Sequence, residues 1–253
     1  MKDDAATPYP AYQIVGAERP GRWLVTCDHA SNAVPPMVGG GDLGLPEADM
    51  NRHIAYDIGA AEVTLRLADL LDAPAILSTF SRLVIDPNRG EDDPTLLMQI
   101  YDGTVIPGNR DIDAAERERR LNLLYRPYHD AIVRLGAKRD DRVFLPIHSY
   151  TPRLNGRPER PWHIGVLHDD KDSRFANALI ARLRQESDLF VGDNEPYSGA
   201  LAGDSVDRHA LQTGRANALI EIRHDLIDTS EGQARWAQRL APILEDALAR
   251  TQL

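Results

Sequence analysis

Three short runs of the sequence are apolar and β-prone, and each leads to a residue that could take part in catalysis. His29 follows the first run, His148 follows the second, and Glu221 lies near the end of the third. Two neutral imidazoles and a carboxylate can hold Zn²⁺ with one coordination position open, where the metal polarises a carbonyl and lowers the pKa of a water molecule to about 7. A second carboxylate outside the metal shell can take the proton. These residue types predict metal-assisted hydrolysis.

Two arginines near another short apolar run supply the charge that an anionic substrate needs. Arg82 precedes residues 83–85, and Asn88 and Arg89 follow them. A guanidinium fork holds a carboxylate through two parallel hydrogen bonds. Spacing by itself does not identify the site, because the chain has no His-Glu-x-x-His motif and the two histidines are far apart in the sequence. Their proximity has to follow from the fold.

Cys27 is the single cysteine of the chain, which excludes an internal disulfide framework and a zinc site built from several cysteines. Its place in an apolar run beside a polar turn permits two interpretations, a nucleophile or a small buried hydrophobic side chain. We favour the buried side chain, and a cysteine hydrolase is the least favoured function.

The composition predicts an acidic globular protein. The chain has 253 residues, 42% of them hydrophobic, and a net charge of −10. This charge argues against a basic nucleic-acid-binding surface, although an acidic protein can bind an anion if positive charge is concentrated in a pocket. The N-terminus lacks the pattern of an export signal and no apolar run approaches membrane-spanning length, so we expect a cytoplasmic protein without membrane contact.

Local patterns predict an extended N-terminal arm over residues 1–20 and one domain over residues 21–253. Apolar residues at helical spacing predict a helix of about 18 residues that starts at Ile54 and a helix over residues 114–135 that Pro127 kinks or breaks. Further helices are expected after Asp172 or Ser173 and after Ser230. Strands are expected at Trp23–Cys27, Ala75–Ser78, 83–85, 142–147, 162–167 and 218–222.

Strands that alternate with helices predict a three-layer α/β/α domain with a central mixed sheet. In such a sheet, polar residues at the ends of strands from distant parts of the chain can meet at one edge. The sequence therefore predicts that His29, Asn88, Arg89, His148 and Glu221 converge.

Four blocks of sequence carry a more specific signal. They are Asp28-His29-Ala30-Ser31-Asn32, Ser81-Arg82-Leu83-Val84-Ile85-Asp86-Pro87-Asn88-Arg89, His148-Ser149-Tyr150-Thr151-Pro152 and Leu219-Ile220-Glu221-Ile222-Arg223. In this order the blocks resemble the N-formylglutamate amidohydrolase (deformylase) family, over roughly residues 20–245. The arrangement is more distantly similar to aspartoacylase and the zinc carboxypeptidases, which implies a zinc-carboxypeptidase-like hydrolase fold.

The resemblance implies a role for each matched residue of the metal site. His29 and His148 would bind one zinc ion per chain. Glu221 would be the general base, which moves a proton from the attacking water to the leaving amine. The substrate would be an N-acyl acidic amino acid such as N-formylglutamate.

The resemblance also implies residues that bind this anionic substrate. Asn88 and Arg89 match the pair that binds the substrate's carboxylate. Arg82 matches an arginine that meets either the carboxylate or the oxyanion. Arg208 and His209 resemble an Arg-His pair on a late loop that reaches the pocket.

The third metal ligand is open among three residues. The carboxypeptidase pattern has a glutamate three positions after the first histidine, where this chain has Asn32. Asp49 and His53 resemble an Asp…His stretch of the formylglutamate family, and if residues 47–57 are helical they share a face with Asp57. We expect Asp49 to be the ligand, with His53 next, whereas a plain helix cap is the alternative role for Asp49.

Two further departures concern the surroundings of the histidines. Asp28 stands where the family has a proline before the first histidine, and Pro146 stands where it usually has an acidic residue two positions before the second. Loss of that carboxylate would remove a hydrogen-bond partner of a metal ligand. Metal affinity and substrate preference depend on such partners.

Three functions are compatible with these residues. The first is a zinc amidohydrolase that cleaves an N-acyl amino acid, formylglutamate or a relative of it. The second keeps the metal but cleaves a small peptide, as a carboxypeptidase does. The third is a catalytically silent homologue that binds an acidic metabolite through Arg82, Asn88 and Arg89, and its metal content would distinguish it.

Overall fold

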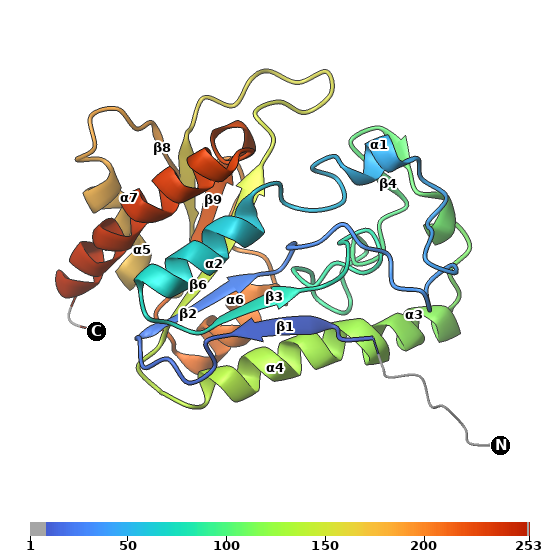
Figure 1. Ribbon diagram of the computed structural model, residues 1–253, viewed down its shortest axis with the longest axis horizontal. Coiled ribbons are helices and arrows are strands. Elements are labelled where there is room, and N and C mark those ends of the chain that lie inside the picture. Colours follow the sequence, from blue (N-terminus) through green and yellow to red (C-terminus); the bar gives the residue numbers. More distant parts are fainter. Residues whose placement is uncertain (1–8, 252) are drawn as a thin grey trace.

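The computed structural model describes residues 9–251 and 253 (Figure 1). Within them, seven strands form one mixed sheet in the order β1-β3-β2-β6-β9-β7-β8. Strands β3, β2, β6 and β9 are parallel to one another, whereas β1, β7 and β8 run in the opposite direction. The strands are β1 (Tyr12–Val15), β2 (Trp23–Cys27), β3 (Ala75–Ser78), β6 (Val143–Tyr150), β7 (Ile164–Leu167), β8 (Val191–Asp193) and β9 (Leu219–Arg223).

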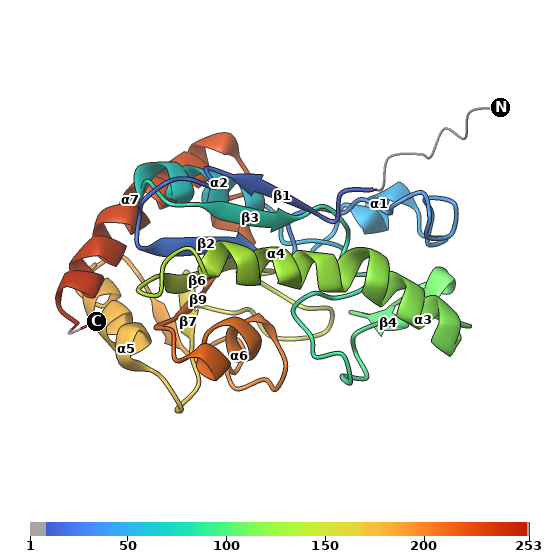
Figure 2. The same ribbon diagram turned by 90° about the horizontal axis from the view of Figure 1, so that it is seen from below.

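Helices cover both faces of the sheet, which confirms the predicted three-layer α/β/α fold. Helices α2 (Ala60–Leu70), α5 (Arg174–Leu183) and α7 (Ser230–Ala249) pack on one face, and α4 (Arg126–Gly136) and α6 (Ser205–His209) pack on the other (Figures 1 and 2). The remaining elements are α1 (Glu47–Met50), α3 (Ala114–Arg120), the hairpin β4 (Ile100–Tyr101) and β5 (Thr104–Val105), and the 3₁₀ turns Pro107–Asn109, Leu211–Thr213 and His224–Leu226.

The layers follow from the alternation of side chains along the strands. On β2, Val25 and Cys27 belong to the core beneath α2 and α7, whereas Leu24 belongs to the core beneath α4. Successive side chains of a strand point to opposite faces, so a central strand that is apolar throughout must be covered on both sides. All five residues of β2 are buried.

Two elements near the site differ from the prediction. Residues 83–85 were expected to form a strand, but Leu83 and its neighbours form turns within a second core cluster under the loops. The helix expected from Ile54 starts only at Ala60, because Gly59 adopts a left-handed conformation (φ 76°) at its N-cap. In both stretches the apolar residues are buried by tertiary packing, so their spacing does not report local secondary structure.

The long helix expected over residues 114–135 is present with an irregularity. Between α3 and α4 lies one π-helical turn, Leu121–Tyr125, and Pro127 stands at the start of α4. A proline has no N–H to donate to a carbonyl of the preceding helical turn. A π turn at this point lets the helix continue without that hydrogen bond.

The expected N-terminal arm is partly a strand. Tyr12–Val15 forms β1, which pairs antiparallel with β3 at the edge of the sheet, and the part before residue 9 lies outside the described residues. No described helix is long and apolar enough to cross a membrane.

Candidate active site

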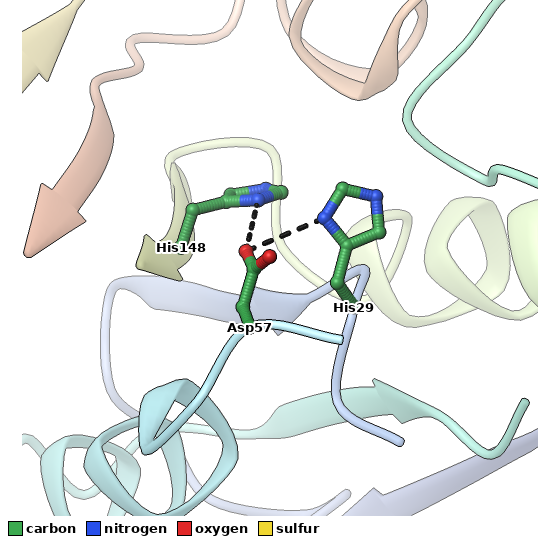
Figure 3. A group of neighbouring side chains, drawn as sticks. All are labelled: His29, Asp57 and His148. Atoms are coloured by element: carbon green, nitrogen blue, oxygen red, sulfur yellow. Dashed lines mark hydrogen bonds and ion pairs between the residues drawn. The ribbon is translucent and has the colours of Figure 1, made fainter. Parts of the chain in front are cut away.

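Two histidines and an aspartate from distant parts of the chain meet in the structure. Nδ1 of His29 lies 3.3 Å and Nδ1 of His148 lies 2.9 Å from the same oxygen, Oδ2 of Asp57. Figure 3 shows the three side chains pointing toward one another. All three are buried, and their ligand atoms lie within 4.8 Å of one another. Two imidazoles and a carboxylate in this arrangement could hold a divalent metal ion.

The sheet explains why these three residues meet. His29 follows the carboxyl end of β2, and His148 lies on the neighbouring parallel strand β6. Asp57 lies in the turn before α2, and its backbone N–H donates to the carbonyl of His29 (2.9 Å). Carboxyl ends of adjacent parallel strands and the start of the following helix share one edge of a sheet, where α/β proteins bind ligands.

A buried carboxylate also contacts the outer nitrogen of each histidine. Nε2 of His29 lies 2.7 Å from Oδ1 of Asp86, and Nε2 of His148 lies 3.2 Å from Oδ2 of Asp28. A metal-binding histidine commonly donates its second ring N–H to a carboxylate, which fixes its tautomer and orientation. The residues present therefore fit a divalent ion, which His29, Asp57 and His148 would hold.

The charge around the two histidines supports the same conclusion. Asp28, Asp57 and Asp86 are buried carboxylates, and Arg82 is the buried arginine that pairs with two of them. Buried charge requires compensation, and with neutral imidazoles this group carries an excess of negative charge that a divalent cation would balance. Without a metal, burial would lower the pKa of His148, but hydrogen bonds to Asp28 and Asp57 raise it well above its usual value.

Glu221 lies beside the histidines but outside their cluster. On the adjacent parallel strands β6 and β9, His148 and Glu221 are register partners. Oε2 of Glu221 is buried and has no hydrogen-bond partner among the described residues. Burial, opposed by the charge of His148, raises the pKa of Glu221 to about 7. A carboxyl group with this pKa can accept and return a proton near neutral pH.

Arg82 connects the cluster to the pocket wall. Its Nε and Nη2 donate to Oδ2 of Asp86 (3.2 and 2.8 Å), and its Nη1 donates to Nδ1 of His29 (3.2 Å). A metal ion held by His29 would compete with Arg82 for that nitrogen. The charge of the guanidinium is partly balanced by Asp86.

Asn88 and Arg89 lie in a turn that forms part of the pocket wall. The backbone N–H of Asn88 donates to Oδ1 of Asp86 (2.9 Å), and its side-chain oxygen accepts from the backbone of Ser205 (3.2 Å). Arg89 donates to Thr95 and to the carbonyl of Asn88, and within the described residues it forms no ion pair. The guanidinium of Arg89 is therefore free to bind a carboxylate.

These residues line one pocket of about 130 Å³. The pocket wall includes six residues that the sequence singled out: His29, Arg82, Asn88, Arg89, His148 and Glu221. Asp57, His53 and Asp204 contribute further polar groups. Burial raises the pKa of Asp204 to about 7.

The expected third ligand, Asp49, is not part of the cluster. Its carboxylate pairs with Arg52 (2.7 Å), because helix α1 has only four residues and does not carry a shared face to Asp57. His53 lines the pocket, but its Nε2 lies 3.5 Å from Asp102 rather than among the ligand atoms. Asn32 donates to the carbonyl of Met50 (3.0 Å).

Arg208 and His209 lie behind the pocket wall and are not among its lining residues. Arg208 donates to the hydroxyl of Tyr125 (2.9 Å). His209 is buried and forms a hydrogen bond with His129 (Nε2 to Nδ1, 2.8 Å). The structure therefore places this pair in support of the pocket rather than on its surface.

Sequence reasoning missed Asp57 as a candidate ligand and Asp28 as a partner of His148. Asp57 stands shortly before the first long helix, at the sheet edge where ligands bind, and this position was its available signal. The loss expected from Pro146 is made up from the adjacent strand: Thr26 is the register partner of Pro146, so Asp28 comes alongside His148 two residues later.

Fold and site together define a three-layer α/β protein with a candidate metal centre at the carboxyl edge of its parallel strands. The family model of N-formylglutamate amidohydrolase (FGase) matches residues 21–228. The chain therefore belongs to the N-formylglutamate amidohydrolase family, whose members hydrolyse a linear amide bond. No curated protein matches the sequence.

Two solved structures are similar over nearly the whole chain. Gene product Atu2144 from Agrobacterium tumefaciens is 37% identical, with a TM-score of 0.88 over 94% of this chain and 95% of that chain. N-formylglutamate amidohydrolase from Ralstonia eutropha JMP134 is 23% identical, with a TM-score of 0.61 over 94% of this chain and 97% of that chain. The second similarity supports the fold.

Proposed function

We propose that this protein is a zinc-dependent amidohydrolase that cleaves an N-acyl amino acid, with N-formylglutamate as the first substrate to test. The observation that carries the proposal is the buried His29–Asp57–His148 cluster with Glu221 beside it. A zinc ion there would polarise the amide carbonyl and make a water molecule nucleophilic near neutral pH. Asp57 replaces Asp49 as the proposed third ligand.

Glu221 is the proposed general base. Its buried, unpartnered oxygen lies at the pocket wall, and its pKa of about 7 suits transfer in both directions. The carboxylate takes a proton from the attacking water and delivers it to the leaving nitrogen, so that the amine departs as a neutral group.

The arginines are proposed to divide the substrate's negative charge between them. Arg89 has no ion-pair partner among the described residues and binds the substrate's carboxylate, assisted by the amide of Asn88. Arg82 lies against His29 and Asp57, and it stabilises the charge that develops on the amide oxygen.

The test combines metal analysis with turnover of a defined substrate panel. Purified protein is expected to contain one zinc per chain and to hydrolyse N-formylglutamate in preference to dipeptides. Preference for dipeptides would favour a carboxypeptidase-like activity, and an intact fold that binds no zinc would favour a silent metabolite-binding homologue.

The variant Glu221→Gln addresses the mechanism. It is expected to retain zinc and to lower kcat by about a thousandfold, because the amide cannot accept the proton. Normal turnover by this variant would contradict the assigned role of Glu221.

A further inference from the structure

Two tyrosine hydroxyls from one helical segment reach the two halves of the site. Tyr125 ends the π-helical turn before α4, and Tyr128 lies in the first turn of α4. Both side chains are fully buried, so each hydroxyl needs a partner inside the protein. The two partners belong to different parts of the candidate site.

Tyr128 contacts the metal half. Its hydroxyl donates to Oδ1 of Asp28 (2.6 Å), and the other oxygen of Asp28 lies 3.2 Å from Nε2 of His148. Asp28 is fully buried, so its direction is set by these two contacts. The hydroxyl thereby holds the carboxylate that orients the imidazole of His148.

Tyr125 contacts the substrate half. Its hydroxyl donates to the backbone carbonyl of Arg89 (2.6 Å) and accepts from Nη2 of Arg208 (2.9 Å). The guanidinium of Arg208 also lies over the ring of Tyr125, 5.3 Å from its centroid. The main chain of the turn that carries Asn88 and Arg89 is therefore fixed from behind by Tyr125 and Arg208.

Both tyrosines lie where the π turn passes into α4. Tyr125 is the N-cap residue of α4, and Tyr128 follows it by three residues in the first helical turn. Pairs three residues apart lie on neighbouring positions of one helix face. A single rigid element thus contacts both halves of the pocket.

We propose that Tyr125 and Tyr128 are positioning residues with separate tasks: Tyr128 orients His148 through Asp28, and Tyr125 orients the carboxylate-binding turn through the carbonyl of Arg89. This inference rests on the proposed function, which supplies the metal and the anionic substrate. It also gives Arg208 a role, as the residue that holds the hydroxyl of Tyr125 in place.

Phenylalanine substitutions test the proposal, because they remove each hydroxyl and keep the buried ring. Tyr128→Phe is expected to weaken zinc binding about fivefold in a chelator competition, with KM unchanged at saturating zinc. Tyr125→Phe is expected to raise KM and the dissociation constant of L-glutamate about fivefold, with kcat and zinc affinity unchanged.

Tyr12→Phe is the matched control. The hydroxyl of Tyr12 accepts from Arg134 on the outer side of the same helix (3.1 Å), so its loss should change neither quantity. If a phenylalanine variant does not fold, Asp28→Asn replaces Tyr128→Phe and Arg208→Gln replaces Tyr125→Phe. Asp28→Asn is then expected to weaken zinc binding, and Arg208→Gln is expected to weaken glutamate binding.

Two results would overturn the inference. One is unchanged zinc and glutamate binding in both variants, and the other is an equal loss of both properties in each variant, as a general weakening of the fold would cause. A wild-type protein that binds zinc and glutamate but does not hydrolyse N-formylglutamate would contradict the proposed function, while the positioning test would still apply. A wild-type protein that binds neither would contradict both.

Discussion

Asp57 is the residue on which the candidate metal site depends most directly. One of its oxygens lies within 3.3 Å of both inner histidine nitrogens and also accepts from the backbone N–H of Ser149 (3.2 Å). Burial would raise the pKa of Asp57, but the charge of His29 and a hydrogen bond from His148 hold it well below its usual value. The side chain is therefore ionised at any pH at which the protein would be assayed.

A pair of aspartate variants separates the structural assignment from the one based on sequence. Asp57→Asn is expected to lower zinc affinity at least tenfold, because an amide oxygen carries no charge to offset the metal. Asp49→Asn should leave zinc affinity unchanged, since Asp49 pairs with Arg52 outside the cluster. Zinc titration with a competing chelator measures both, and the opposite order of effects would restore Asp49 as the ligand.

The pKa of Glu221 predicts the pH dependence of hydrolysis. A general base must be deprotonated, so kcat/KM should fall as the pH decreases through the pKa of Glu221 and level off above it. Burial raises this pKa to about 7, and a nearby metal ion would lower it, so the acid limb is expected at or somewhat below pH 7. A pH–rate profile that is flat from pH 5 to 8 would contradict this assignment.

The surroundings of Cys27 do not favour a nucleophile. Its side chain is fully buried, and burial raises the pKa of the thiol well above its usual value. A thiol is reactive only as the thiolate and when a substrate can reach it. The interpretation as a small buried hydrophobic residue therefore agrees with its surroundings.

At the scale of elements, the start of α2 sets the position of Asp57. Gly59 has φ +76°, and a Cβ there would lie 2.0 Å from the carbonyl oxygen of Ile227. The hydroxyl of Ser149 on β6 donates to the carbonyl of Ile58 (2.8 Å), which ties the same turn to the central sheet. The turn before α2 is thus held between β6 and the loop that precedes α7.

A substitution in this turn is expected to affect both stability and metal binding. Gly59→Ala combines an unfavourable backbone conformation with a backbone clash, and we expect a loss of about 3 kcal/mol in the free energy of unfolding together with weaker zinc binding. Gly156→Ala is the control, since Gly156 has φ +68° but open space around its Cβ, and it should cost about 1 kcal/mol without affecting zinc. Equal effects in denaturant titrations would argue against a special role for this turn.

Strand register is the second determinant at this scale. Because β2, β6 and β9 are parallel neighbours, Asp28, His148 and Glu221 come to adjacent positions on one side of the sheet. A shift of register by one residue would move every side chain of a strand to the other face. The candidate site and the apolar core therefore depend on the same pairing.

At the scale of the whole molecule, the candidate metal site joins segments from most of the chain. Five separate stretches of the chain contribute to the site and its surroundings, and one sheet brings them together. They carry His29, Asp57, Asp86, His148 and Glu221. A metal ion that binds only when these stretches are together stabilises the folded state by mass action. That residues 21–253 fold as one unit stays a prediction.

Metal addition is therefore expected to raise the thermal unfolding temperature. Zinc at a hundredfold excess over its dissociation constant contributes about 2.7 kcal/mol, which corresponds to an increase in Tm of roughly 5–10 °C for a chain of this length. A chelator should reverse the shift, and Asp57→Asn should reduce it. A Tm that zinc leaves unchanged in the wild-type protein would argue against a metal site in the folded core.

The sequence by itself determined the class of fold and most of the pocket. Apolar runs that alternate with helical patterns indicated a three-layer α/β domain. His29, His148 and Glu221 stood out as polar residues in or directly after apolar runs, because a chain changes from buried to polar residues at the end of a strand. The family resemblance assigned Arg82, Asn88 and Arg89 their roles toward the substrate.

Only the tertiary structure decided which carboxylates surround the histidines. Asp57 was selected over Asp49 because the chain turns rather than forming a helix between them, and Asp28 replaced the acidic residue missing at Pro146 because the register of two strands places it there. Local patterns are set by short-range preferences and burial, whereas these contacts depend on the pairing and packing of segments that are distant in the sequence.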